Sequence, residues 1–234
     1  MDISFLNKNQ QQAVVHKEGP MLVLAGAGSG KTSVLTNRIA YLIEQGISPA
    51  NILAITFTNK AAREMKERVT KLIGLDARYI QISTFHSFGL KIIKENYEFL
   101  GYDKNFIILD SDDTLTVVKK LMKDLNMNPK YYNARELRSK ISSAKNELIT
   151  PEKFKKQEFD EKIVTLYKKY CQKLKAGNSV DFDDLLILPI KLFEISPSIL
   201  NSYQERYKYI LIDEYQDTNE AQYVFSKMLS KKYR

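Results

Sequence analysis

The 234-residue sequence predicts an α/β protein in which a parallel-sheet domain is interrupted by an inserted all-helical subdomain. Short apolar runs rich in β-branched residues occur in the first 90 residues and again from Tyr209, and such runs are typical of buried parallel strands. From about residue 91 to residue 180, helical periodicity dominates instead. We therefore expect residues 1–90 and 181–234 to form one sheet domain, with residues 91–180 as the helical insertion.

The expected strands are short apolar runs, and the expected helices lie between the first three of them. The strands are residues 21–25, 52–57, 79–83 and 209–212. Residues 32–44 and 59–73 carry apolar side chains at three- and four-residue spacing, which predicts amphipathic crossover helices. Strands that alternate with helices in this way indicate a parallel sheet.

Composition and charge narrow the class of protein. Apolar residues make up 44% of the chain, which is enough for real hydrophobic cores and argues against disorder. The 36 Lys and Arg against 28 Asp and Glu give a net charge of +8, which favours a polyanionic partner, either nucleic acid or an acidic membrane surface. Residues 91–180 hold 19 of these cations against 13 acids, although a solvated helix face is the more common role for any single lysine there.

The sequence predicts a cytoplasmic protein that has no membrane span. Cys171 is the only cysteine, so no internal disulfide can form. The first residues have neither the basic stretch nor the apolar core of a signal peptide. No apolar run approaches the roughly 20 residues that a membrane helix needs.

A glycine-rich segment follows the first expected strand and opens the first expected helix. It reads Ala25-Gly26-Ala27-Gly28-Ser29-Gly30-Lys31-Thr32. Small residues let successive N–H groups point at phosphate oxygens, and the helix N-terminus adds the positive end of a dipole. In this pattern the lysine reaches the β- and γ-phosphates and the threonine hydroxyl binds Mg²⁺. The segment therefore predicts a site for a nucleoside triphosphate with Mg²⁺, with Ala25 in place of the usual first glycine.

An acidic segment follows the last expected strand, and it reads Asp213-Glu214-Tyr215-Gln216-Asp217-Thr218. A carboxylate at the end of a core parallel strand lies beside the phosphate loop, where Asp213 can hold Mg²⁺ directly or through water. Glu214 is then placed to polarise the attacking water as a general base. Gln216 could bridge the γ-phosphate to the rest of the protein. Asp217, Thr218 and Asn219 also resemble caps for a helix that begins near Glu220.

With four further segments, these motifs resemble the UvrD/Rep/PcrA family of superfamily 1 DNA helicases over nearly the whole chain. The further segments are Leu6-Asn7-Lys8-Asn9-Gln10, Thr56-Phe57-Thr58-Asn59-Lys60-Ala61-Ala62, Ser83-Thr84-Phe85-His86-Ser87-Phe88 and Asp181-Phe182-Asp183-Asp184-Leu185-Leu186. The resemblance implies a RecA-like sheet domain that uses ATP and Mg²⁺, with Gln10 reading a donor and an acceptor on adenine. It also implies that residues 181–186 re-enter the sheet domain after the insertion.

The resemblance assigns residues to three tasks. The ATP-binding set is Gln10, Ala25, Gly26, Ala27, Gly28, Ser29, Gly30, Lys31, Thr32 and Ser33, with Thr32 and Asp213 as Mg²⁺ ligands. The catalytic set is Lys31, Asp213, Glu214 and Gln216. The single-stranded DNA set is Phe57, Thr58, Asn59, Lys60, Thr84, Phe85 and His86. Many relatives have arginine where this chain has Ser33, so we expect weaker contact with the base.

The DNA set also has a physical rationale, and each member has a structural alternative. Both segments follow expected strands at the edge where open α/β sheets bind ligands. Phe57 offers a stacking face to a base, while the polar side chains can contact phosphates or sugars without reading sequence. Phe57, Phe85 and Phe88 could instead be core aromatics, and Asn59 a helix cap. His86 alone would more often be structural.

The function implied is an ATP-dependent DNA helicase that moves 3′ to 5′ on single-stranded DNA and binds duplex junctions without sequence preference. One alternative is the motor subunit of a recombination helicase–nuclease complex; others are a small-molecule phosphotransferase and a binding module with little turnover. Since the sequence ends at Arg234, we expect a second motor domain beyond it and near-inactivity of this chain alone. A role in repair or in replication stays open.

Overall fold

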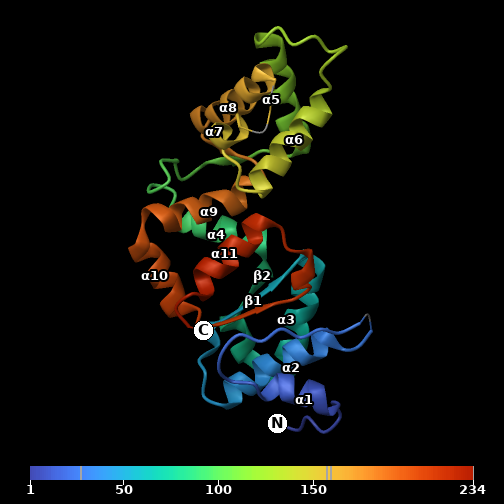
Figure 1. Ribbon diagram of the computed structural model, residues 1–234. Coiled ribbons are helices and arrows are strands. Elements are labelled where there is room, and N and C mark those ends of the chain that lie inside the picture. The colour runs from blue at the N-terminus through green and yellow to red at the C-terminus, as the bar shows by residue number, and fades with distance from the viewer. Residues whose placement is uncertain (27, 157, 159, 234) are drawn as a thin grey trace. The chain divides into compact units, whose positions relative to one another are not determined.

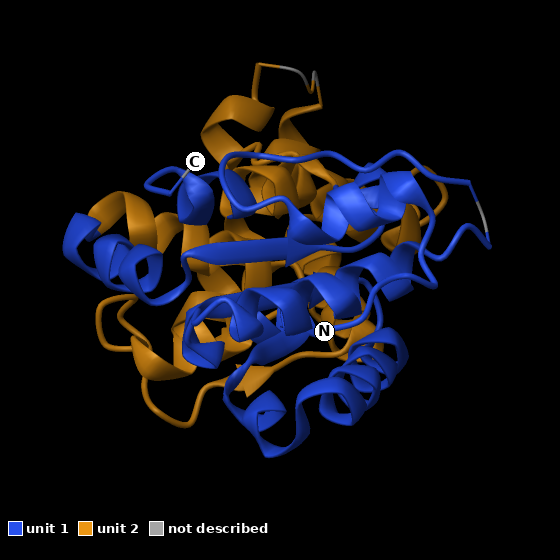
Figure 2. Cartoon of the chain, turned by 90° about the horizontal axis from the view of Figure 1, so that it is seen from below, with its two compact units in different colours: residues 1–88, 196–218, 226–234 blue, residues 89–195, 219–225 orange. Residues whose placement is uncertain are grey.

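The computed structural model describes the chain except for Ala27, Gln157, Phe159 and Arg234. The chain forms two compact units (Figure 2). Unit 1 comprises Met1–Phe88, Ser196–Thr218 and Ser226–Arg234, and unit 2 comprises Gly89–Ile195 and Asn219–Phe225. The segment 181–186 thus falls within unit 2.

Unit 1 is built on a parallel sheet of three strands in the order β2-β1-β5. The strands are β1 (Ile52–Thr56), β2 (Gln81–Thr84) and β5 (Tyr209–Ile212). All five residues of β1 are buried, because both its edges are hydrogen-bonded and both its faces are covered. The α/β class and the parallel pairing predicted from the sequence are confirmed.

Three N-terminal helices pack together in unit 1 (Figure 1). They are α1 (Lys8–Val15), α2 (Lys31–Glu44) and α3 (Asn59–Ile73). Ile39 of α2 and Met65 of α3 share one apolar cluster with Ile52 of the central strand, as expected of amphipathic crossover helices. The buried guanidinium of Arg38 donates to backbone carbonyls at the end of α1 and so ties α1 to α2.

The strand predicted at residues 21–25 is wrong. These residues have no strand conformation, and Leu22 and Leu24 are 67% and 87% exposed. An apolar β-branched run predicts burial, but a strand also needs a hydrogen-bonded neighbour. Among the described residues, both edges of β1 are occupied by β2 and β5, and neither of these pairs with residues 21–25.

Unit 2 is mainly helical. Its helices are α5 (Ser111–Asp124), α6 (Ala134–Asn146), α7 (Pro151–Phe154), α8 (Glu161–Ala176) and α9 (Asp184–Ile195). Val118, Ile141 and Leu166 lie in a single core cluster that joins α5, α6 and α8. Two short strands, β3 (Ile107–Ile108) and β4 (Ser179–Val180), pair in parallel at either end of the helical region.

A buried ion cluster lies within unit 2. The ammonium of Lys145 is 2.7 Å from a carboxylate oxygen of Asp181 and 2.7 Å from one of Asp184. The hydroxyl of Tyr170 donates to Asp181 at 2.9 Å. Since an unpaired buried charge is costly, these groups stabilise one another only as a set.

The remaining elements connect these parts of the chain. They are α4 (Phe85–Glu95), α10 (Pro197–Arg206), α11 (Glu220–Ser230) and the 3₁₀ turns η1 (Pro49–Asn51), η2 (Gly74–Tyr79) and η3 (Tyr215–Asp217). A Cβ on Gly89 would lie 1.9 Å from the carbonyl oxygen of Leu185, so α4 and α9 approach more closely there than any side chain allows. Across the described residues, no single helix has the length and composition of a membrane span, and only α9 and α10 taken together reach them.

Candidate functional site

The glycine-rich loop leads into the first turn of α2. Gly28 and Gly30 have φ angles of 72° and 83°, in the left-handed region that glycine adopts without strain. A Cβ on Gly30 would also lie 3.1 Å from the side-chain nitrogen of Gln10. Ala27, part of the predicted ATP-binding set, lies outside the described residues.

Lys31 lies between the loop and the acidic segment. Its ammonium donates to the carbonyls of Ala25 and Gly26, both at 3.3 Å, and is 3.9 Å from a carboxylate oxygen of Glu214. The Lys31 side chain is 27% exposed. These contacts are long, and a stronger acceptor such as a phosphate oxygen could replace them.

Thr32 and Ser33 continue the first turn of α2. The amides of this turn are among the N–H groups that a helix leaves without a backbone partner. Such N–H groups, with the positive end of the helix dipole, suit an anion. The backbone carbonyl of Ser33 accepts from the side chain of Asn37 at 2.8 Å, one turn further on.

Gln10 is joined to the phosphate loop. Its side-chain nitrogen donates to the carbonyl of Ser29 at 2.8 Å, and its side-chain oxygen accepts from the backbone of Asn7 at 2.9 Å. Asn7 in turn caps α1, so the two side chains form a capping box. The amide of Gln10 keeps one hydrogen and one lone pair for a ligand. The sequence did not reveal the contact with Ser29, because nineteen positions separate the two residues.

Asp213 directly follows β5 and extends its pairing. Its backbone amide donates to the carbonyl of Ile55 at 2.9 Å, and only 9% of the residue is exposed. Burial raises the pKa of the Asp213 carboxyl, the charge of Glu214 raises it further, and Lys31 opposes the rise. A nearby divalent cation would relieve this unfavourable burial.

Glu214 adopts a conformation that is rare for a residue with a side chain. Its φ of 48° and ψ of 45° lie in the left-handed region, which costs on the order of 1–3 kcal/mol. The side chain of Gln216 donates to the Glu214 carboxylate at 2.7 Å and so fixes its orientation. Strained residues of this kind cluster at functional sites.

The predicted caps after the acidic segment are confirmed for one residue. The side chain of Asn219 accepts from the backbone of Gln222 at 2.9 Å, and the Gln222 side chain accepts from the backbone of Asn219 at 3.1 Å. Asp217 lies in η3 instead, and Thr218 donates its hydroxyl to the carbonyl of Tyr215. The side chain of Asn219 also donates to Asn146 at 2.8 Å, within unit 2.

A magnesium ion at this site would take few protein ligands. Nowhere in the part of the chain that the structure describes do three or more His, Cys, Asp or Glu side chains gather as a metal site. Mg²⁺ is commonly held by one or two protein oxygens together with substrate phosphates and water. The buried carboxylate of Asp213 and the hydroxyl of Thr32 fit that sparse donor set.

Aromatic residues of the predicted DNA set divide between surface and core. Phe57 follows β1 and is half-buried, with its ring centroid 5.9 Å from that of Phe85 in an edge-to-face contact. Phe85 and Phe88 are 1% and 0% exposed, so both occupy the core positions that the sequence also allowed. Of these three rings, only that of Phe57 is partly open, and Phe85 packs against it.

Polar residues of the predicted DNA set form a small network. Thr58 caps α3 by accepting from the backbone of Ala61 at 3.1 Å, so the suggestion that Asn59 is the cap is wrong. The hydroxyl of the buried Thr84 donates to Ser87 at 2.9 Å, and Ser87 donates to the side-chain oxygen of Asn59 at 3.5 Å. The exposed Ser87, which the sequence did not single out, therefore joins the two segments.

Two basic members of the DNA set differ in charge. The Lys60 side chain is 86% exposed and lies 4.0 Å from Glu64, a weak surface pair. Burial lowers the pKa of His86 to about 4, so its imidazole is neutral at neutral pH. Lys60 can attract a phosphate by charge, whereas His86 can only exchange hydrogen bonds.

Comparisons with known proteins agree on one family. Residues 6–234 match the model of the UvrD/REP helicase N-terminal domain. The chain is 50% identical, over 99% of its length and 32% of the relative, to the ATP-dependent DNA helicase PcrA of Bacillus subtilis (strain 168). It is 47% identical to proteins of the same name from Staphylococcus aureus (strain Mu50) and Staphylococcus epidermidis, again over 32% of each. The chain thus spans about a third of the length of these relatives.

Proposed function

The chain belongs to the UvrD/REP helicase N-terminal domain family, and from this premise we propose that it is the first motor domain of an ATP-dependent DNA helicase. In this proposal it binds Mg·ATP and single-stranded DNA with a RecA-like core of residues 1–90 and 181–234, carrying residues 91–180 as an insertion. The observation that carries the proposal is the position of Lys31, between the phosphate loop and Glu214 at 3.9 Å. A triphosphate placed there would meet a cation, helix N–H groups and two carboxylates.

The residues around Lys31 suit hydrolysis of a terminal phosphate. Lys31 exchanges its carbonyl contacts for the β- and γ-phosphates, and the first-turn amides of α2 hold the same oxygens. Asp213 and Thr32 would hold Mg²⁺, which when bound would offset the charge that builds on the phosphates. Glu214 accepts a proton from the attacking water, while Gln216 holds the Glu214 carboxylate in place.

Adenine selection rests on Gln10. Its amide is already fixed against the loop at Ser29, so its spare hydrogen and lone pair have a defined direction. A base with a neighbouring donor and acceptor, as adenine has, could pair with both. Ser33 adds no ring or cation to stack on the base, which supports only modest affinity.

Single-stranded DNA would lie along the ends of β1 and β2. Phe57 offers the partly open ring for stacking, Lys60 offers charge, and Asn59 and Ser87 offer hydrogen bonds to the backbone. None of these groups reads base edges, so binding should lack sequence preference and weaken with salt. In the whole protein we propose 3′ to 5′ translocation and unwinding at duplex junctions, completed by a second motor domain C-terminal to Arg234.

Calorimetry with Mg·ATP tests this function on the chain itself. We expect weak binding that Lys31→Ala abolishes, because one charge-assisted contact contributes on the order of 1.5–3 kcal/mol. Lys66→Ala is the matched control, since it removes an exposed lysine from α3. If the Lys31 variant bound Mg·ATP as well as the control variant did, the proposed site would be misplaced.

A further inference from the structure

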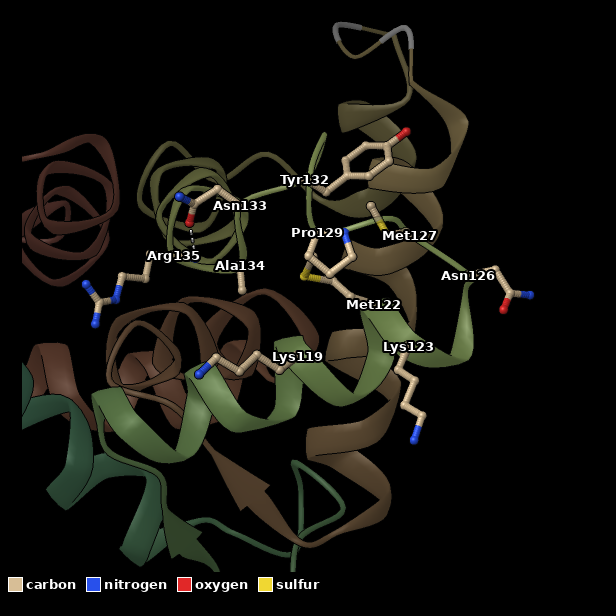
Figure 3. A pocket seen from close by; sticks show the side chains of 10 residues that line it. All are labelled: Lys119, Met122, Lys123, Asn126, Met127, Pro129, Tyr132, Asn133, Ala134 and Arg135. Atoms are coloured by element: carbon tan, nitrogen blue, oxygen red, sulfur yellow. Dashed lines mark hydrogen bonds between the residues drawn. The ribbon is translucent and has the colours of Figure 1, made fainter.

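A cavity of about 800 Å³ opens within unit 2. It lies between the C-terminal half of α5, the connecting segment 126–133 and the first turn of α6 (Figure 3). Its lining residues are Lys119, Met122, Lys123, Asn126, Met127, Pro129, Tyr132, Asn133, Ala134 and Arg135. We call this the α5–α6 groove, and its volume is in the range of sites that bind ligands.

The floor of the α5–α6 groove is apolar. Met122 and Met127 are 5% and 3% exposed and belong to the core cluster of unit 2. Pro129 lines the same groove, and Figure 3 labels all three side chains. Methionine is flexible and polarisable, so a floor of this kind adapts to partners of different shape.

The rim of the α5–α6 groove is cationic. Lys119, Lys123 and Arg135 line it, and the lining residues include no Asp or Glu. Within the described part of the chain, none of these three cations takes part in an ion pair. In Figure 3, Lys119 and Lys123 extend from α5 and Arg135 from the start of α6. The groove is therefore complementary to an anionic occupant that also has apolar side chains.

We propose that the α5–α6 groove binds an acidic amphipathic segment of a partner protein. Its apolar side chains would rest on the methionine floor, and its carboxylates would pair with the rim cations. This is the helix-in-groove mode of recognition, and methionine, aromatic residues and arginine are the side chains enriched at such interfaces. A phosphate backbone would use the cations but gain nothing from the apolar lining, which includes Pro129, Tyr132 and Ala134, so this lining favours a peptide over nucleic acid.

The probe is a fluorescein-labelled helix-forming peptide of about 15 residues, with Leu at three- and four-residue spacing and Glu elsewhere. Fluorescence anisotropy with the whole chain measures its binding. We expect the double variant Lys119→Glu with Arg135→Glu to weaken binding at least about tenfold, the scale of one lost charge-assisted contact. The control is Lys168→Glu with Lys169→Glu, which makes the same change in net charge on the exposed face of α8 and should leave affinity within about twofold.

A second variant tests the floor without removing a charge. Ala134→Phe adds a ring at the partly buried start of α6 and should block the groove, so peptide binding should fall while the thermal melting curve keeps its shape. A peptide with Lys in place of Glu should not bind. Lys31→Ala should keep peptide binding, which separates this site from the nucleotide site.

Three results would overturn the proposal. One is an equal loss of affinity in the rim variant and in the α8 control, which would mean attraction by overall charge. Another is full peptide binding in both groove variants. The third is loss of binding to a forked DNA oligonucleotide in the rim variant with peptide binding unchanged, which would make nucleic acid the occupant.

Discussion

Lys31 in unit 1 and Lys145 in unit 2 both face carboxylates, but their surroundings differ. Lys31 is 27% exposed, 3.9 Å from one carboxylate and 3.3 Å from two carbonyls. Lys145 is 5% exposed and 2.7 Å from both Asp181 and Asp184. Burial lowers the pKa of Lys145, but the two carboxylates outweigh burial and raise it well above its usual value.

The difference indicates which lysine is available to a ligand. A lysine held by long, solvent-exposed contacts can exchange them for phosphate oxygens at little cost. A lysine enclosed with two carboxylates cannot leave without stranding their charge in the core. Burial raises the pKa of Asp184 to about 6. Burial also acts to raise the pKa of Asp181, but the charge of Lys145 and the hydrogen bond that Lys145 donates to Asp181 outweigh it, so this pKa is lowered. The buried contacts of Lys145 therefore suit a structural role, whereas Lys31 can exchange its contacts for those of a ligand.

The largest effect we expect is on stability. Lys145→Met keeps the aliphatic stem but leaves two buried carboxylates without a cation, and should lower the free energy of unfolding by about 3–5 kcal/mol. Urea denaturation followed by circular dichroism measures it. Lys31→Met, at the open site, should change stability by no more than about 0.5 kcal/mol. Equal losses in the two variants would remove the contrast between the lysines.

The next effect concerns the metal dependence of the open site. Asp213→Asn should weaken ATP binding on the order of tenfold in the presence of Mg²⁺ and leave it unchanged in EDTA, because only the metal contact is lost. Calorimetry with Mg²⁺ and with EDTA separates the loss of the metal contact from any other loss of ATP affinity. The same loss in EDTA would show that Asp213 acts on the loop rather than on the metal.

An effect of similar size is expected at the half-buried ring of unit 1. Phe57→Ala should remove about 1–3 kcal/mol from binding to single-stranded DNA and leave duplex contacts largely intact. Anisotropy with single-stranded and forked oligonucleotides at two salt concentrations measures both. Phe99→Ala removes a 63% exposed ring from unit 2 and serves as the control. Charge reversals among the unit 2 lysines should weaken duplex binding more than single-strand binding, the opposite pattern.

The smallest effect is expected beside the loop. Ser33→Arg would add a guanidinium able to stack on a base, and exposed contacts of this type contribute about 0.5–1 kcal/mol. We therefore expect ATP affinity to rise about two- to fivefold. GTP affinity, measured in the same way, reports whether Gln10 still selects adenine. No gain with ATP would place the base away from α2.

Much of the fold could be predicted from local patterns. The helix at Asn59–Ile73 and the strand at Tyr209–Ile212 have the predicted bounds, because their apolar spacing is unambiguous. The strand predicted at residues 21–25 was wrong because the segment is equally apolar, but whether it pairs as a strand depends on residues far away in the sequence.

The candidate site likewise has features that the sequence predicted and features that it did not. Residue types and order predicted which side chains would flank the loop, and Lys31 does lie near Glu214. The left-handed backbone of Glu214 and the link from Gln10 to Ser29 are tertiary features without a local signal. The pairing of Lys145 with Asp181, thirty-six positions apart, is a third.

The small sheet of β3 and β4 joins the beginning of the helical region to its end. The backbone amide of Ile107 donates to the carbonyl of Asn178 at 3.0 Å, so the two ends of the helical region lie side by side. Because β3 and β4 pair in parallel, the chain leaves this region in the same direction in which it enters it. For a flexible loop whose ends are held in this way, each doubling in length costs only about 0.6 kcal/mol. Chains that keep the β3–β4 pairing and the ion pairs of Lys145 with Asp181 and Asp184 can therefore vary in loop length between Ile108 and Ser179 with little penalty elsewhere.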